Sequence, residues 1–168
     1  MSTLTYVTGV LNLTLNILCD KTSGDVSEVR ESLNVTGSDT LANGILIDQQ
    51  DEYYADRRTV AAAAEDLDLT SLTDALNRTV SFQKVKGIFI KNLSVSAGEI
   101  LTVGGDANSL PFLTTATDSI KVGPDGLLLL TAPSVAGITV TGGTGDIIQI
   151  DPGAASITYD IVIWGIKT

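Results

Sequence analysis

Five aspartates are the residues of this sequence whose type and position could do chemistry. They lie at or beside turns predicted from glycine and proline, and they are Asp106, Asp118, Asp125, Asp146 and Asp151. Clustered carboxylate oxygens at such turns could ligate calcium. None of the five fits the spacing of a known calcium loop, and aspartate is a standard turn former that hydrogen-bonds its own backbone. The pattern favours structural turns, and we expect no metal site.

Catalytic chemistry finds little support. Two of the carboxylates could serve a glycosidase as acid and base, but aromatic residues, which usually line sugar sites, are only 5% of the chain. The chain has no histidine and a single cysteine, Cys19, which excludes histidine-based triads, disulfides within the chain and zinc clusters. The glycines at positions 142, 143 and 145 resemble a phosphate loop, but neither a lysine nor a predicted helix follows them. We expect a protein that is not an enzyme and uses no cofactor.

The charge balance restricts the partners. Among 168 residues, 20 are acidic and 10 basic, a net charge of −10 that would repel phosphate backbones. No stretch approaches the roughly 20 apolar residues that span a bilayer, and the first five residues do not begin a signal peptide. We therefore expect no nucleic acid and no membrane as partner, and synthesis in a cytoplasm.

The apolar content points to another kind of partner. Only 18% of the residues are charged while 43% are hydrophobic. A soluble monomer normally carries more charge, because interspersed charges prevent association. We expect a surface of Ser, Thr, Asn and Gly, together with apolar surface that a partner covers.

The five aspartates must be positioned by β-strands, which the sequence predicts from Lys86 onward. Ile157, Tyr159, Ile161 and Ile163 alternate with other residues, and alternate residues of a strand share a face. Short strands between turn signals indicate a sandwich or barrel. Residues 127–130 are four leucines, which suits a strand covered on both faces. Residues 138–140 and 147–150 are expected to form a hairpin.

The N-terminal half is patterned less regularly. Leu11, Leu13, Leu15 and Ile17 alternate with polar residues, which predicts a half-buried strand. Residues 23–39 are polar and loop-like, with a weak strand at 34–36, and a short strand is expected at 45–47. Residues 57–63 are interpreted as a strand, because charges at the ends of a helix there would oppose its macrodipole. A short helix is predicted at residues 71–76, capped by Ser71.

The fold expected from these patterns is all-β: a jelly-roll-like β-sandwich with one short helix. We expect residues 1–168 to form a single domain. Residues 1–20 are expected to be an extended N-terminal strand or arm.

One cluster of aromatic and arginine residues stands out. Tyr53, Tyr54, Arg57 and Arg58 lie within six positions of one another, and both residue types are enriched at interface hot spots. We select these four as interface residues, with the equal alternative that they line one side of an ordinary strand. For Trp164, an interface position and a core position are likewise both open.

Several segments together resemble a group of small tailed-bacteriophage virion proteins, over roughly residues 55–165. These segments are EDLDL at 65–69, LTDAL at 72–76, VSF at 80–82, VKGIFIKN at 85–92 and YDIVIWG at 159–165. The group consists of jelly-roll capsid decoration proteins, also called cement proteins. The resemblance implies a homodimer or homotrimer on the capsid exterior of the virion that staples adjacent subunits of the major capsid protein.

A second function remains open beside this one. The acidic loops could belong to a receptor- or carbohydrate-binding module of a phage tail or fibre that uses calcium.

Overall fold

The computed structural model describes residues 9–21, 29–74 and 77–167. These residues form β-strands and no helix. In chain order the strands are β1 (Gly9–Lys21), β2 (Val29–Asn43), β3 (Gln49–Gln50), β4 (Glu52–Ala61), β5 (Glu65–Asp68), β6 (Leu72–Thr73), β7 (Thr79–Val80), β8 (Phe82–Asn92), β9 (Leu101–Gly104), β10 (Ser119–Val122), β11 (Leu127–Thr131), β12 (Ile138–Thr139), β13 (Ile147–Asp151) and β14 (Ser156–Lys167).

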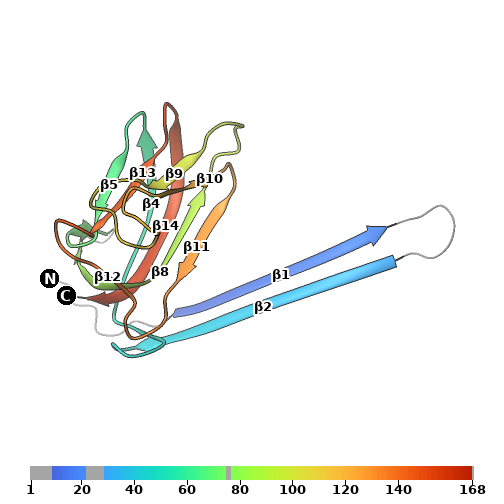
Figure 1. The fold of residues 1–168 in the computed structure, drawn as a ribbon, viewed down its shortest axis with the longest axis horizontal. Helices are drawn as coiled ribbons and strands as arrows, with labels where there is room; N and C mark the ends of the chain where they lie inside the picture. The colour runs from blue at the N-terminus through green and yellow to red at the C-terminus, as the bar shows by residue number, and fades with distance from the viewer. Residues whose placement is uncertain (1–8, 22–28, 75–76, 168) are drawn as a thin grey trace.

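Two antiparallel sheets face each other as a β-sandwich (Figure 1). One sheet has the strand order β10-β9-β13-β5. The other, which we call the arm-side sheet, has the order β11-β8-β14-β4, with β12 also paired to β8. The predicted all-β class is confirmed.

The core lies between the two sheets because alternate positions of their strands are apolar. On β14, Ile157, Tyr159, Ile161 and Ile163 are all fully buried, as their spacing predicted. Both sheets contribute to one continuous cluster, which also includes Leu67, Ile88, Ile90, Leu101, Val103, Ile148 and Ile150. Burial of these side chains is the main favourable contribution to folding.

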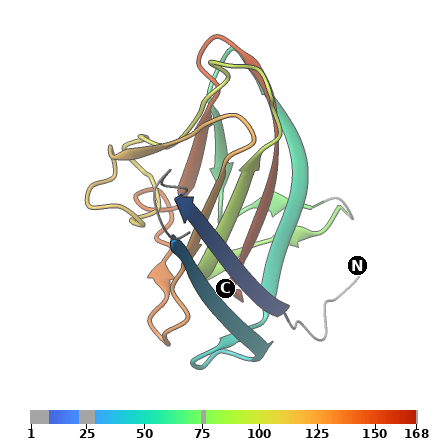
Figure 2. The same ribbon diagram turned by 90° about the vertical axis from the view of Figure 1, so that its right-hand side faces the viewer.

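A long two-stranded hairpin, which we call the arm, projects from the base of the sandwich (Figures 1 and 2). β1 and β2 pair antiparallel from Gly9 opposite Leu41 to Lys21 opposite Val29. Figure 2 shows the arm in front of the arm-side sheet, and Figure 1 shows that it leads away from the sandwich. The sequence pattern marked the second strand only weakly at 34–36, and residues 1–8 of the expected N-terminal arm lie outside the described residues.

The predicted short helix at residues 71–76 is wrong in its described part. Leu72 is buried and pairs with Val80 in the β6–β7 ladder. Ser71, the expected helix cap, donates its hydroxyl to Asp68 Oδ2 at 3.0 Å. The Ser71 hydroxyl that was expected to cap a helix is therefore bound within a tight turn at Asp68. Residues 75–76 lie outside the described part.

Two strand predictions fail because pairing is decided by distant partners. Residues 45–47 form a bend between β2 and β3 instead of a strand. β12 pairs with β8, whereas β13 pairs with β5 and β9. Residues 138–150 consequently do not form the expected hairpin, although an isolated bridge joins Thr141 to Gly145 at the glycine turn.

The leucine run forms β11 at the edge of the arm-side sheet. The prediction that both of its faces are covered is wrong for the single chain. Leu128 packs against the core, but Leu127 keeps 59% of its surface exposed and Leu129 is half-buried.

Candidate interaction surfaces

β4 places the four selected residues on two opposite faces. Tyr54 and Arg58 point toward the inside of the sandwich, and Tyr54 is fully buried. Tyr53 and Arg57 belong to the outer face, because successive residues of a strand alternate between faces. The structure therefore does not bring the four together, and an interface role remains a prediction that concerns mainly the outward pair and the partly exposed Arg58.

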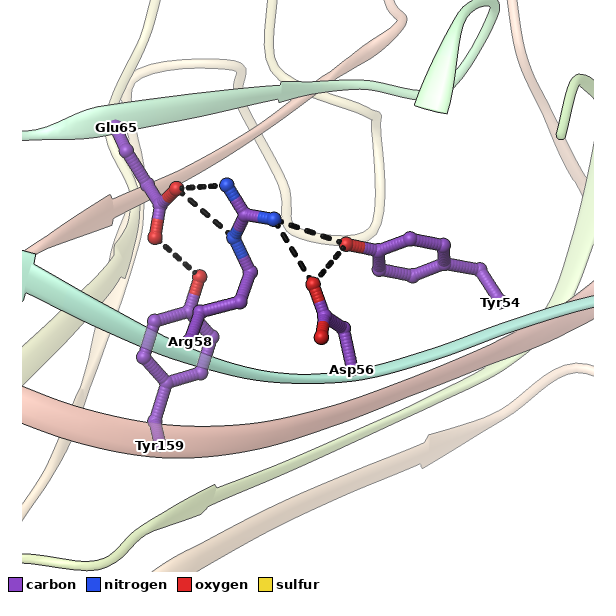
Figure 3. A network of polar contacts seen from close by, with 5 residues as sticks. All are labelled: Tyr54, Asp56, Arg58, Glu65 and Tyr159. Carbon is purple, nitrogen blue, oxygen red and sulfur yellow. Dashed lines mark hydrogen bonds and ion pairs between the residues drawn. The ribbon is translucent and has the colours of Figure 1, made fainter. Parts of the chain in front are cut away.

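The inward residues form a polar network between the sheets (Figure 3). The Arg58 guanidinium donates two hydrogen bonds to Glu65 Oε2, at 2.8 and 3.0 Å. It also donates to the Tyr54 hydroxyl at 3.2 Å and to Asp56 Oδ2 at 3.0 Å. The Tyr159 hydroxyl donates to Glu65 Oε1 at 2.6 Å. Because Glu65 belongs to the opposite sheet, the network ties the two sheets together.

Burial sets the protonation states in this network. Desolvation raises the pKa of Tyr54 and, together with the bond to Glu65, that of Tyr159, so both phenols stay neutral donors. Hydrogen bonding to Glu65 raises the pKa of Arg58. With its donors and acceptors paired to one another, the network is suited to holding the two sheets together.

The outer face of the arm-side sheet carries paired charges. Arg57 on β4 lies opposite Asp160 on β14 and binds its carboxylate with two nitrogens at 2.6 and 2.9 Å. This hydrogen bonding lowers the pKa of Asp160. Lys91 of β8 pairs with Asp125 at 3.1 Å.

Between these charges runs an apolar row across the sheet. The register aligns Ala55 of β4 with Val162 of β14, Val162 with Phe89 of β8, and Phe89 with Leu129 of β11. All four residues are half-buried. We call them the apolar row.

Tyr53 and Trp164 lie beside the apolar row. They are register partners, and Trp164 is only 9% exposed because its indole lies over Gly87, where a Cβ would come within 1.9 Å of the ring. The Arg78 guanidinium lies 5.5 Å from the centre of the Tyr53 ring, within the range of a cation–π contact. Trp164 is thus a buried residue of the outer face.

A second apolar surface lies at the base of the arm. Ile45, Leu46 and Ile47 are each 59% exposed in the bend that follows β2. The fully buried Lys86 donates its ammonium to Leu46 O at 2.7 Å and to Pro133 O at 3.3 Å. Desolvation lowers the pKa of Lys86. The buried ammonium therefore fastens this bend to the loop that follows β11.

The five aspartates of the loops serve backbone turns or ion pairs. Asp106, Asp118, Asp146 and Asp151 each accept a hydrogen bond from a backbone amide two or three residues away. Asp125 adopts a positive φ of 54° and pairs with Lys91. Among the described residues, no three His, Cys, Asp or Glu side chains gather in a way that could hold a metal ion.

An open pocket of about 490 Å³ lies between residues 97–102 and 151–155. Lys121, Glu99 and Asp151 are its charged lining residues, and no aromatic residue lines it. The Glu99 carboxylate accepts a hydrogen bond from Ser94, and Asp151 Oδ1 accepts one from Gly153 N. Two of the three charged groups are therefore already engaged in local structure.

No protein-family model, curated protein or solved structure matches this chain. In the part of the chain that the structure describes, no helix has the length and apolarity of a membrane span. The geometry of the candidate surfaces is therefore the only support for their assignment.

The apolar row was missed from the sequence, although a signal was present. Phe89 lies between Ile88 and Ile90, and Val162 lies between Ile161 and Ile163, so both faces of β8 and β14 are apolar there.

Proposed function

We propose that this protein is a structural, non-catalytic component of a tailed-bacteriophage particle. It oligomerises on the capsid exterior and staples adjacent subunits of the major capsid protein. The observation that carries the proposal is the arm, a paired hairpin that leaves the sandwich and reaches beyond it (Figure 1). An isolated two-stranded hairpin is at best marginally stable in water, so an arm of this length is suited to lying on a neighbouring subunit.

The strand order supports a sandwich of the jelly-roll type. If the eight sandwich strands other than β12 are numbered in chain order, the arm-side sheet reads 6-3-8-1 and the other sheet reads 5-4-7-2. In this numbering, strands 1 and 2, 3 and 4, 5 and 6, and 7 and 8 occupy matching positions in the two sheets. This is the arrangement of a long hairpin wound into a sandwich. Jelly rolls with eight strands recur in viral capsid proteins and in lectins.

The composition of purified particles tests the proposal directly. We expect the protein to copurify with mature capsids at a fixed, high ratio to the major capsid protein. A few copies per particle, confined to the tail, would refute capsid decoration.

Charges placed on the arm test how it binds the shell. The pair Leu13→Asp and Leu15→Asp adds two charges at positions that share one face of β1. The pair Asn12→Asp and Thr14→Asp adds the same two charges at positions of the other face. We expect only the leucine pair to abolish co-sedimentation with shells that lack the protein, and equal binding by both variants would contradict the role of the arm.

A receptor- or carbohydrate-binding module of a tail or fibre is the second candidate. The open pocket beside residues 151–155 and the occurrence of jelly rolls among lectins favour it. Thermal melting with and without a chelator separates the two functions, because a calcium-dependent module loses stability when its ion is removed. An unchanged melting temperature would count against such a calcium-dependent module.

A further inference from the structure

The arm-side sheet is apolar on both of its faces. Its inner face buries Ile88, Ile90, Ile161 and Ile163 in the core, and its outer face carries the apolar row. An antiparallel sheet at a surface normally alternates between apolar residues inside and polar residues outside. The row Ala55, Val162, Phe89 and Leu129 breaks that alternation on all four strands, which is the pattern of a sheet with a second cover.

The described residues of the single chain cover the apolar row only in part. The residues of the apolar row are half-buried, Leu127 at the edge is 59% exposed, and the arm leads away from the sandwich (Figure 1).

The arm has a complementary pattern. Its register places Leu15 opposite Val35 and Ile17 opposite Leu33. Leu13 has the same parity on β1, so these positions share one face of the paired strands. That face also carries Asp39, opposite Leu11, and Glu31, opposite Cys19, so its apolar part is the middle of the arm. At the base of the arm, Leu41 of that same parity is only 4% exposed.

The dimensions of the two surfaces agree. With a rise of about 3.3 Å per residue and a strand spacing of about 4.8 Å, the paired length of β1 covers roughly 43 by 10 Å. Four strands of the arm-side sheet span a width of roughly 19 Å, enough for a hairpin to lie across them at the spacing of packed sheets. One arm face is about half of the roughly 800 Å² per partner of a standard interface, so a stable contact needs a second arm or the adjoining bend at residues 45–47.

The charges on the outer face permit the approach of a like-charged copy. Arg57 is paired with Asp160, and Lys91 with Asp125. Although each chain carries a net charge of −10, each of these two carboxylates lies beside a cation, which reduces the local repulsion on this face.

We propose that the arm of one copy lies across the outer face of the arm-side sheet of a second copy, with its apolar face on the apolar row. The inference rests on the self-assembly in the proposed function and names the surfaces that perform it. The contact joins two different patches, so it closes as a reciprocal dimer or as a ring of three.

Light scattering coupled to size-exclusion chromatography tests the contact with the full-length protein. Val162→Asp places a charge in the apolar row, and Val95→Asp makes the same change at a loop residue that is 87% exposed. We expect Val162→Asp to weaken self-association by about tenfold or more and Val95→Asp to leave it unchanged. If both variants assemble like the wild type, the inference is overturned. Leu129→Asp on the edge strand repeats the test if Val162→Asp fails to fold, as judged by thermal melting.

Chemical crosslinking gives an independent readout that needs no destabilising charge. Cys19 on β1 has the same parity as the apolar arm residues and serves as the native thiol. Thr158→Cys adds a thiol on the outer face of the arm-side sheet, and Thr102→Cys adds one on the opposite sheet. With a flexible bismaleimide we expect linked oligomers from Thr158→Cys well above the wild-type level, and only that level from Thr102→Cys. Equal yields would contradict the proposal.

The failure of this inference differs from a failure of the proposed function. A wild-type protein that is monomeric alone but binds shells overturns the arm contact and leaves the capsid role standing. A protein that neither self-associates nor binds shells overturns both.

Discussion

Tyr159 of β14 donates its hydroxyl to Glu65 of β5 across 2.6 Å, and this bond joins the two sheets of the sandwich. The second oxygen of Glu65 accepts both hydrogen bonds from Arg58. One carboxylate therefore holds a phenol and a guanidinium from two neighbouring strands of the facing sheet.

Glu65→Gln is expected to lower the free energy of unfolding by about 1–2 kcal/mol. The change removes the charge that faces Arg58, and hydrogen bonds to charged groups contribute about 1.5–3 kcal/mol when buried, less here because the Arg58 side chain is 33% exposed. Tyr159→Phe removes a single hydrogen bond and should cost about 1 kcal/mol. Urea unfolding measures both.

Asp160→Asn is the control, because it breaks an ion pair whose arginine is largely in solvent, and it should change stability little. A larger loss from Asp160→Asn than from Glu65→Gln would contradict the role of the network.

Gly87→Ala is expected to destabilise the arm-side sheet. The new methyl group would lie 1.9 Å from Trp164 Cζ2, so the indole must move away from the outer face, at the cost of about 1–3 kcal/mol typical of overpacking. Gly123→Ala is the matched control, because a methyl group added there would meet no atom within 4 Å. Thermal melting and Trp fluorescence report the effect, and equal melting temperatures for the two variants would disprove the close approach.

Stability is expected to fall as the pH drops below about 4. The pKa of Asp68 is lowered from 3.8 by the hydrogen bonds that it accepts from Thr70, and that of Asp160 by Arg57. A carboxyl whose pKa is lower in the folded state adds stability above its unfolded pKa, and this stability is lost as the pH falls through the folded pKa. Urea midpoints at several pH values check this. Asp68→Asn should show a shallower decline, whereas the exposed pair of Asp160 and Arg57 contributes little to it, and an unchanged slope in Asp68→Asn would argue against Asp68.

Lys86→Met is expected to loosen the bend at the base of the arm. Methionine keeps the apolar stem but removes the ammonium that binds Leu46 O and Pro133 O. Hydrogen exchange of the peptides around residues 44–50 and 132–137 should accelerate, while that of β14 should stay close to the wild-type rate. Lys84→Met is the control, because Lys84 donates only to Val135 O at an exposed position. Slow exchange in Lys86→Met would show that the ammonium does not hold the bend.

Local patterns in the sequence determined the class of the fold and most of its strands. The two-residue period of β8 and β14 predicted both strands and the buried face of β14, because the pleat makes successive side chains point to opposite sides. Glycine and proline likewise marked the turn at residues 123–126, where Gly126 N donates to Gly123 O. These features depend on residues that are close in the chain.

Only the tertiary structure decided which strands pair and which faces remain open. The bonds of β12 to β8 and of β13 to β5 and β9 join distant segments, and the preference of a strand for a partner depends on its packing context. For the same reason Tyr53 and Tyr54, adjacent in the chain, separate into an outer face and the core, and four leucines become an edge strand with Leu127 exposed. Periodicity states which residues share a face, but only the arrangement of the sheets states which face meets the core.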